Sequence, residues 1–382
     1  MRLIFLTWVF VLIFTALYAA SALPSSFEFH ELTTADSVRI RAGHFCGDGA
    51  IAEESTDKVI FVLPGRVSRI ERHEFLAKQF AKSGFGVWVL DFRGQGGSQR
   101  LVDNQQMVHV DNFNEYLHDV EALMHLARFA GQRKFLYGHS MGGQVALQVM
   151  QNHPSIFEAA VLEAPMLRIK TAPIPYFLSA PIAYVMANWL GRGKQYCLGR
   201  GDYDVVKESF EHNRNCRDRD LFDQHFFIPE SHKELIPDGP SWGWLHAAFS
   251  ATRNLLSALA HLRAVRTKVF IATASDDKVL DTSFDATVAS TLSGAHCVYP
   301  GAWHCLLHDT LDTRRHYLAH LSDFLSHPDD FISAHRAVAP ARTGWVLWLW
   351  SLRGSLRVQM LNLIKCALIL KLIKRVFIDY SP

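Results

Sequence analysis

The sequence has few cysteines and almost no net charge, and each of these shortages excludes a class of protein. Six cysteines are dispersed over 382 residues without metal-ligand spacing, so neither a disulfide scaffold nor a metal site is expected. Cys197 and Cys216 would close a short loop in an oxidising compartment, and two separate thiols are the equal alternative. The formal charge of +2 argues against a nucleic-acid partner held by the whole surface.

Apolar residues are abundant enough to form a large core. They make up 49% of the chain against 20% charged residues, which excludes a disordered protein. A chain of this length forms either one large domain with an insertion or two modest domains.

The amino-terminal segment has the layout of an export signal. Arg2 precedes 18 residues without a charge, LIFLTWVFVLIFTALYAA (3–20), and Ala20-Ser21-Ala22 fits a small-x-small cleavage site. Because a stretch of this length is also about the minimum that spans a bilayer, an uncleaved anchor is the alternative. Both interpretations of residues 1–22 predict an exported body, either periplasmic or associated with the inner membrane.

The carboxyl-terminal segment, residues 342–382, is a basic and apolar tail. It carries seven lysines and arginines against one aspartate. Its apolar runs are too short for a clean span, so we expect a helix lying in the headgroup region of a lipid surface. A helix packed on a partner or on the body of the protein is the alternative.

Between these ends, short β-branched or aromatic runs alternate with helical patterns. Their almost continuous hydrophobicity predicts strands buried on both faces of a parallel sheet, and the repeated strand–helix order predicts an open α/β architecture. We expect strands at 58–63, 86–91, 134–138, 159–165, 268–274 and 295–301, after an antiparallel hairpin formed by 26–32 and 37–45. Helices are expected at 74–84, 113–131 and 141–153, the second of them ending at Gly131.

One interval breaks the alternation of strands and helices. Residues 166–250 show no strand–helix unit and are crowded with aromatic side chains, which indicates a lid inserted after the sixth strand, over the active-site edge of the sheet. A subdomain that serves packing alone is the alternative. Residues 27–165 and 251–330 then form the two parts of one core.

Two stretches fit the pattern Gly-x-Ser-x-Gly, which marks a nucleophilic serine in one large enzyme fold. Ser140, in YGHSMGG (137–143), follows a buried strand and precedes a helix, so a sharp turn would present its hydroxyl above the sheet. Gly138 and Gly142 give that turn room, and the start of the helix directs N–H groups at an oxyanion formed beside the serine. Ser241, in GPSWG (239–243), has no strand before it and a bulky tryptophan after it, so we interpret it as a turn in the lid.

A serine hydroxyl needs a base to remove its proton and an acid to orient that base. In this fold class the acid follows a late strand and the histidine follows the last one. His304 lies in a loop just past the last expected strand, whereas His296 lies inside that strand and His308 is more simply a surface group. Asp276 and Asp277 both follow the preceding strand, and spacing alone does not choose between them.

Several stretches of the chain resemble one enzyme family. LPGRVSRIERHEFLAKQFAKSGFGVWVLDFRGQGGSQR (63–100) and YGHSMGG look like the lysophospholipase and monoacylglycerol lipase branch of the α/β-hydrolases. In the insertion, GRGKQYCLGRGDYDVV (191–206) and LIPDGPSWGWLHAAF (235–249) are most similar to the bacterial lysophospholipases of that branch. The resemblance, from about residue 27 to 325, implies an α/β-hydrolase fold with a mostly parallel central sheet, helices on both faces and a lid after the sixth strand.

The resemblance also implies the site and the reaction. The family's acid directly precedes a basic residue and a hydrophobic pair, which selects Asp277 as the partner of His304 and Ser140. Its oxyanion donors fall on the backbone N–H groups of Arg66 and Met141. The expected reaction is hydrolysis of the fatty-acyl ester of a lysophospholipid at a membrane surface, through a covalent acyl-enzyme and without a metal or organic cofactor. A monoacylglycerol lipase or other carboxylesterase is the alternative, followed by an acyltransferase or a peptidase.

Overall fold

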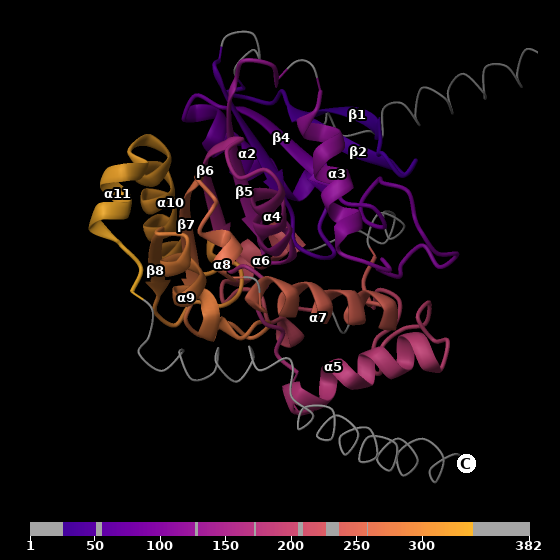
Figure 1. The fold of residues 1–382 in the computed structure, drawn as a ribbon. Helices are drawn as coiled ribbons and strands as arrows, with labels where there is room; N and C mark the ends of the chain where they lie inside the picture. The colour runs from indigo at the N-terminus through magenta and orange to yellow at the C-terminus, as the bar shows by residue number, and fades with distance from the viewer. Residues whose placement is uncertain are drawn as a thin grey trace, which may run out of the picture.

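The structure is a computed structural model that describes residues 26–338 except 51–55, 127–128, 172, 205–208, 227–236 and 258. An eight-stranded sheet forms its centre, in the order β1-β2-β4-β3-β5-β6-β7-β8 (Figure 1). The strands are β1 (Phe27–Thr33), β2 (Arg39–Phe45), β3 (Lys58–Leu63), β4 (Gly86–Asp91), β5 (Arg133–His139), β6 (Phe157–Glu163), β7 (Lys268–Ala274) and β8 (Ala295–Tyr299). β2 pairs antiparallel with β1 and β4, and the other pairs are parallel. Each strand expected from the sequence is present, and the α/β-hydrolase fold is confirmed.

Alternate side chains of the central strands enter two separate cores. In β3, Val59 and Phe61 pack into one cluster, and Ile60 and Val62 pack into the other. The continuous hydrophobicity of this strand therefore reflects burial on both faces. The first core is bordered by α3 (Asn114–Met124), α4 (Met141–Asn152) and α9 (Asp285–Thr291), and the second by α2 (Glu74–Lys82), α10 (Leu311–Ser326) and α11 (Pro328–Ala334).

Helix α3 is shorter than its sequence pattern predicts. It ends at Met124, seven residues before Gly131, although Gly131 does adopt the expected positive φ of 83°. Phe129 is fully buried, with its ring 5.0 Å from that of Phe61 and 5.4 Å from that of Trp88. The chain leaves the helix to place this ring against the sheet, and burial of an aromatic side chain outweighs one more helical turn.

The segment between β6 and β7 forms the predicted insertion. Its helices are α5 (Tyr176–Tyr184), the π-helical turn η4 (Val185–Trp189), the short η5 (Phe210–His212), α6 (Arg219–Phe226), α7 (Trp242–Ser257) and α8 (Leu259–Leu262). α7 packs on the main core through Trp244 and Ala248, and its Phe249 ring lies 5.5 Å from that of Tyr176 on α5. Figure 1 shows α7 between the sheet and α5. The insertion therefore covers one end of the sheet, while its predicted limits at 166 and 250 stay a prediction.

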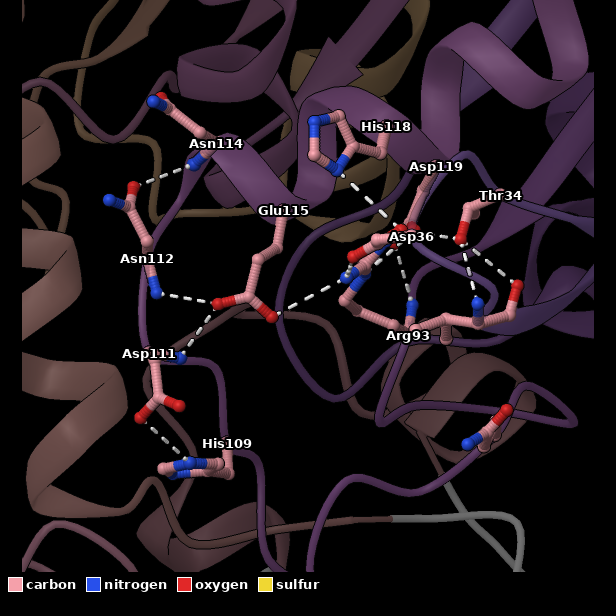
Figure 2. A network of polar contacts seen from close by, with 12 residues as sticks. Thr34, Asp36, Arg93, His109, Asp111, Asn112, Asn114, Glu115, His118 and Asp119 are labelled. Atoms are coloured by element: carbon pink, nitrogen blue, oxygen red, sulfur yellow. Dashed lines mark hydrogen bonds and ion pairs between the residues drawn. The ribbon is translucent and has the colours of Figure 1, made fainter.

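A buried arginine ties the amino-terminal hairpin to helix α3 (Figure 2). The guanidinium of Arg93, in the loop after β4, bonds Asp36 between β1 and β2 at 2.5 Å and Asp119 on α3 at 2.8 Å. Glu115 lies 3.4 Å from it and also accepts the N–H groups of residues 111 and 112. Because a buried guanidinium is tolerated only when it is paired, this network fixes the hairpin and α3 together.

Several expectations concern the ends of the chain and its thiols. The predicted signal or anchor at 1–22 and the predicted tail at 342–382 lie outside the described residues. Within 26–338, apart from the gaps given above, no helix has the length and apolar character that a membrane span requires. Cys197 and Cys216 are both buried free thiols, so the structure shows the unpaired alternative.

Candidate active site

The carboxyl ends of five parallel strands meet at one edge of the sheet. In their order across the sheet, β3, β5, β6, β7 and β8 are followed by the loop of Arg66, the turn of Ser140, the insertion, the loop of Asp277 and the loop of His304. Parallel alignment therefore gathers groups that are far apart in the sequence, as ligand and catalytic groups are gathered in other open α/β sheets.

Ser140 occupies a strained turn between β5 and α4. Its φ of 54° and ψ of −116° lie in a region that costs a non-glycine residue on the order of 1–3 kcal/mol. Its N–H donates to the carbonyl of Glu163 at 3.0 Å, and its carbonyl accepts from Met166 at 2.9 Å. These hydrogen bonds to β6 and to the residues after it hold the serine in a backbone conformation that belongs neither to a helix nor to a strand.

Two glycines make this turn sterically possible. A Cβ atom on Gly138 would lie 2.7 Å from the carbonyl oxygen of Gly142, and one on Gly142 would lie 2.0 Å from the carbonyl oxygen of Leu63. Both distances are far inside van der Waals contact, so neither position accepts a side chain. The steric role that the sequence assigns to Gly138 and Gly142 matches these contacts.

The loop after β3 passes directly beside the serine. A Cβ atom on Gly65 would lie only 3.3 Å from Cβ of Ser140, which brings the adjoining peptide of Arg66 to the same place. Met141 is the first residue of α4, and the first N–H groups of a helix have no acceptor within it. Arg66 and Met141 thus border Ser140 from two sides, and their role as oxyanion donors remains a prediction.

His304 joins the serine to an aspartate. Its Nε2 lies 2.9 Å from Oγ of Ser140, and its Nδ1 lies 2.7 Å from Oδ2 of Asp277. All three side chains are buried. An ionised carboxylate can only accept, so Nδ1 carries the proton and Nε2 is left as the acceptor for the serine hydroxyl. This is the tautomer that a general base requires.

The structure separates the two neighbouring aspartates. Asp277 turns inward, where its Oδ1 accepts the N–H groups of Val279 at 2.7 Å and Leu280 at 2.8 Å. Burial raises its pKa, but attraction to His304 and these hydrogen bonds outweigh burial, so that the pKa lies below its usual value. Asp276 is exposed and pairs with Lys278 at 2.6 Å.

Of the three histidines considered from the sequence, His304 is the one that bonds the serine. His296, on β8, bonds the hydroxyl of Thr273 at 2.9 Å. His308 is half-buried, and burial lowers its pKa to about 3. His308 is thus only partly exposed, because the short turn that carries it places Leu306 and Leu307 in the second core.

Sequence reasoning missed one buried acid at this edge of the sheet. Glu163 is the last residue of β6, is only 2% exposed, and accepts hydrogen bonds from the loop that follows His304. The signal available in the sequence was a charged residue at the end of the otherwise apolar run AAVLEAP. A carboxyl group in such a place is rare unless it has partners.

The second serine motif has a structural role. Ser241 has no exposed surface, and its Oγ accepts from the N–H of Trp244 in the first turn of α7 and lies 2.8 Å from Nδ1 of His109. Its N–H donates to the carbonyl of Val108. Ser241 therefore caps α7 and fastens the insertion to the loop before α3, rather than forming a simple turn.

The donors at this edge suit acid–base chemistry more than metal binding. Among the described residues, no group of three or more His, Cys, Asp or Glu side chains is arranged to hold a metal ion. Three groups linked in a line, with a serine at one end and an ionised carboxylate at the other, are instead suited to nucleophilic catalysis.

Known proteins share this sequence pattern and this fold. The chain is 25% identical over 277 residues to the probable lysophospholipase L2 of Haemophilus influenzae, covering 72% of this chain and 85% of that one. It is also 25% identical over 257 residues to lysophospholipase L2 of Escherichia coli K12, covering 66% and 71%. A soluble variant of monoglyceride lipase from Saccharomyces cerevisiae has a similar fold, with a TM-score of 0.61, 15% identity, and coverage of 80% of this chain and 95% of that one. The sequence model of the Hydrolase_4 family, described as serine aminopeptidase, S33, matches residues 54–311, and this hydrolase belongs to that family.

Proposed function

We propose that this protein cleaves the fatty-acyl ester of lysophospholipids at a membrane surface. The observation that carries the proposal is the hydrogen-bonded line from Ser140 through His304 to Asp277, set on a strained strand-to-helix turn. The substrate class rests on the relatives, which are named as lysophospholipases.

The proposed reaction follows the acyl-enzyme scheme. His304 Nε2 takes the proton of Ser140 as Oγ bonds to the ester carbonyl, and the electron pair of the C=O bond moves to the oxygen. The N–H groups of Arg66 and Met141 hold this oxyanion. Its collapse breaks the bond to the glycerol oxygen, which leaves with the proton from His304. Water then repeats the attack, releases the fatty acid and restores the serine hydroxyl, while Asp277 stabilises the imidazolium in each half.

Action at a membrane surface is supported by the outer side of the insertion. Phe177 and Trp189 are 59% and 61% exposed, and Leu198 is 58% exposed. Phe177 and Tyr184 are seven residues apart on α5 and so share a face, and the Tyr184 ring lies 6.1 Å from that of Trp189. Exposed aromatic side chains gathered in this way mark surfaces that meet lipid or protein.

The charge of the same segment favours a lipid surface with anionic headgroups. Between residues 174 and 200 the chain has the exposed basic residues Arg192, Lys194 and Arg200, and it has no acidic residue there. Apolar side chains flanked by basic groups suit the boundary between acyl chains and anionic headgroups. Export of the protein to the periplasmic side, free or attached to the inner membrane, completes the proposal and rests on residues 1–22.

The decisive experiment is fatty-acid release by the purified protein. Lysophosphatidylethanolamine, lysophosphatidylcholine, a monoacylglycerol and an aminoacyl amide are compared side by side, with Ser140→Ala as the control. We expect release from the lysophospholipids that disappears in Ser140→Ala. Turnover of the monoacylglycerol alone would move the assignment to a neutral-lipid lipase, and turnover of the amide alone would make the protein a peptidase.

The membrane component has its own matched pair of variants. Leu190, beside Trp189, and Leu311, at the start of α10, are 49% and 51% exposed. We expect Leu190→Ser combined with Trp189→Ser to slow hydrolysis of substrate in phosphatidylglycerol vesicles at least about fivefold, and to leave a dissolved short-chain ester unaffected. Leu311→Ser should change neither rate. If the double variant and Leu311→Ser lost the same fraction of the vesicle rate, the insertion would be rejected as the lipid-facing surface.

A further inference from the structure

The carboxyl group of Glu163 lies beneath the loop that carries His304. Its Oε1 accepts the N–H of Leu306 at 2.6 Å and that of Leu307 at 3.4 Å. Its Oε2 accepts the hydroxyl of Tyr137, which stands on the neighbouring strand β5. One side chain thus links the end of β6 to β5 and to two peptides of the loop that carries His304.

The backbone of the same residue supports the nucleophile. The carbonyl of Glu163 accepts the N–H of Ser140 at 3.0 Å. The next residue, Ala164, has a positive φ of 41° and donates its N–H to Ala272 on β7 at 2.8 Å. The end of β6 is therefore fixed on both sides, so a side chain anchored there is a rigid reference for its contacts.

Packing alone does not account for a carboxyl group at this position. Burial raises the pKa of Glu163 to about 7, even though the Tyr137 hydroxyl and the N–H groups of Leu306 and Leu307 favour its ionised form. An apolar side chain would avoid that desolvation, but it would leave the two peptide N–H groups without an acceptor. The carboxyl group of Glu163 thus serves as the hydrogen-bond acceptor for the backbone N–H groups of Leu306 and Leu307.

We infer that Glu163 is a positioning residue that fixes the loop of residues 304–307, and through it the imidazole of His304 between Ser140 and Asp277. The inference rests on the proposed function. Leu306 is two residues from His304, so a shift of its peptide is transmitted to the imidazole within one short loop. A displacement of about 1 Å at a reacting group lowers turnover on the order of 100-fold.

The test compares Glu163→Ala, Glu163→Gln and Glu158→Gln in the full chain. Glutamine keeps an oxygen that can accept the same two N–H groups, whereas alanine removes it. Glu158 lies on the same strand but pairs with Arg133 at the surface, so it controls for changes to β6. With a dissolved short-chain ester, we expect Glu163→Ala to lower kcat on the order of 100-fold with KM changed less than about threefold. The kcat of Glu163→Gln should lie within about fivefold of the wild-type value. The kcat of Glu158→Gln should equal the wild-type value.

A spectroscopic readout keeps the inference separate from the activity. The proton shared by His304 Nδ1 and Asp277 should give a low-field NMR signal in the wild type and in Glu163→Gln, and that signal should be lost in Glu163→Ala. A folded Glu163→Ala that keeps the signal and the wild-type kcat would overturn the inference, as would a glutamine variant no better than alanine. A wild type that shows the signal but hydrolyses no ester would instead overturn the proposed function.

Discussion

Replacement of Asp277 by asparagine is predicted to remove catalysis while leaving the site assembled. The oxygen at Oδ1 is held by the N–H groups of Val279 at 2.7 Å and Leu280 at 2.8 Å. An asparagine must keep its own oxygen there, because the reverse orientation would set its NH₂ group against two donors. The NH₂ group then faces Nδ1 of His304 at the place of Oδ2.

This orientation forces the wrong tautomer on the histidine. An amide donor facing Nδ1 makes that nitrogen an acceptor, so the proton moves to Nε2, which lies 2.9 Å from Oγ of Ser140. A protonated Nε2 cannot take the serine proton. A loss of this kind lowers kcat by roughly 10⁴-fold, which is about 5 kcal/mol of transition-state stabilisation.

The adjacent aspartate provides the matched control. Asp276→Asn removes an exposed pair with Lys278, and such pairs contribute little, so kcat should stay within about twofold of the wild type. Both variants are assayed by steady-state ester hydrolysis and by circular dichroism. A folded Asp277→Asn that keeps a tenth of the wild-type kcat, or an Asp276→Asn that falls as far, would refute the reasoning.

Three further predictions address the turn, the second serine motif and a buried acid. The Cβ atom of Gly142→Ala would lie 2.0 Å from a carbonyl oxygen of β3, so this variant should lose at least about 3 kcal/mol of unfolding free energy in urea. A Cβ atom on Gly201 would meet nothing within 4 Å, so Gly201→Ala should lose less than about 1 kcal/mol. Equal midpoints would contradict the steric argument. Ser241→Ala should lower the free energy of unfolding by about 0.5–2 kcal/mol through loss of the α7 cap. A fluorophosphonate should still label this variant at Ser140. Loss of labelling in the folded variant would show that the roles of the two serine motifs were assigned the wrong way round. Burial raises the pKa of Asp285 to about 8 despite its bond from Thr273, and that carboxyl group titrates at about 4 when unfolded, so wild-type stability should fall as pH rises from about 4 to about 8. Asp285→Asn cannot ionise, so the Tm of this variant relative to that of the wild type should rise between pH 5 and pH 9. A Tm difference that stays constant with pH would exclude this titration.

The strands could be read from the sequence because each is buried on both faces. In a parallel sheet covered by helices, all side chains of a strand such as β3 enter one core or the other, which leaves an uninterrupted apolar run. The end of α3 could not be read in this way. Its pattern continues as far as Gly131, and only the pocket that receives Phe129 decides that the chain turns off earlier.

Two serine motifs of the same form illustrate where local sequence is insufficient. The strand before Ser140 and the helix after it were sufficient to predict a turn that presents the hydroxyl. Ser241 also precedes a helix, and its cap to α7 and its contact with His109 arise from segments more than 100 residues apart. Such a contact has no local pattern, so it could not be predicted from the sequence that this serine fastens the insertion to the core.

Sequence by itself determined the order of strands and helices, the Ser140 turn and the candidate identities of the base and the acid, because backbone geometry and periodic burial act over a few residues. Tertiary structure decided which atoms meet. It turned Asp277 inward and Asp276 outward, although both follow the same strand. The inner side offers the N–H groups of Val279 and Leu280 as hydrogen-bond donors to a carboxylate, whereas the outer side faces water. It also placed Glu163 beneath the histidine loop, a contact between residues 143 positions apart that the fold of the sheet alone brings about.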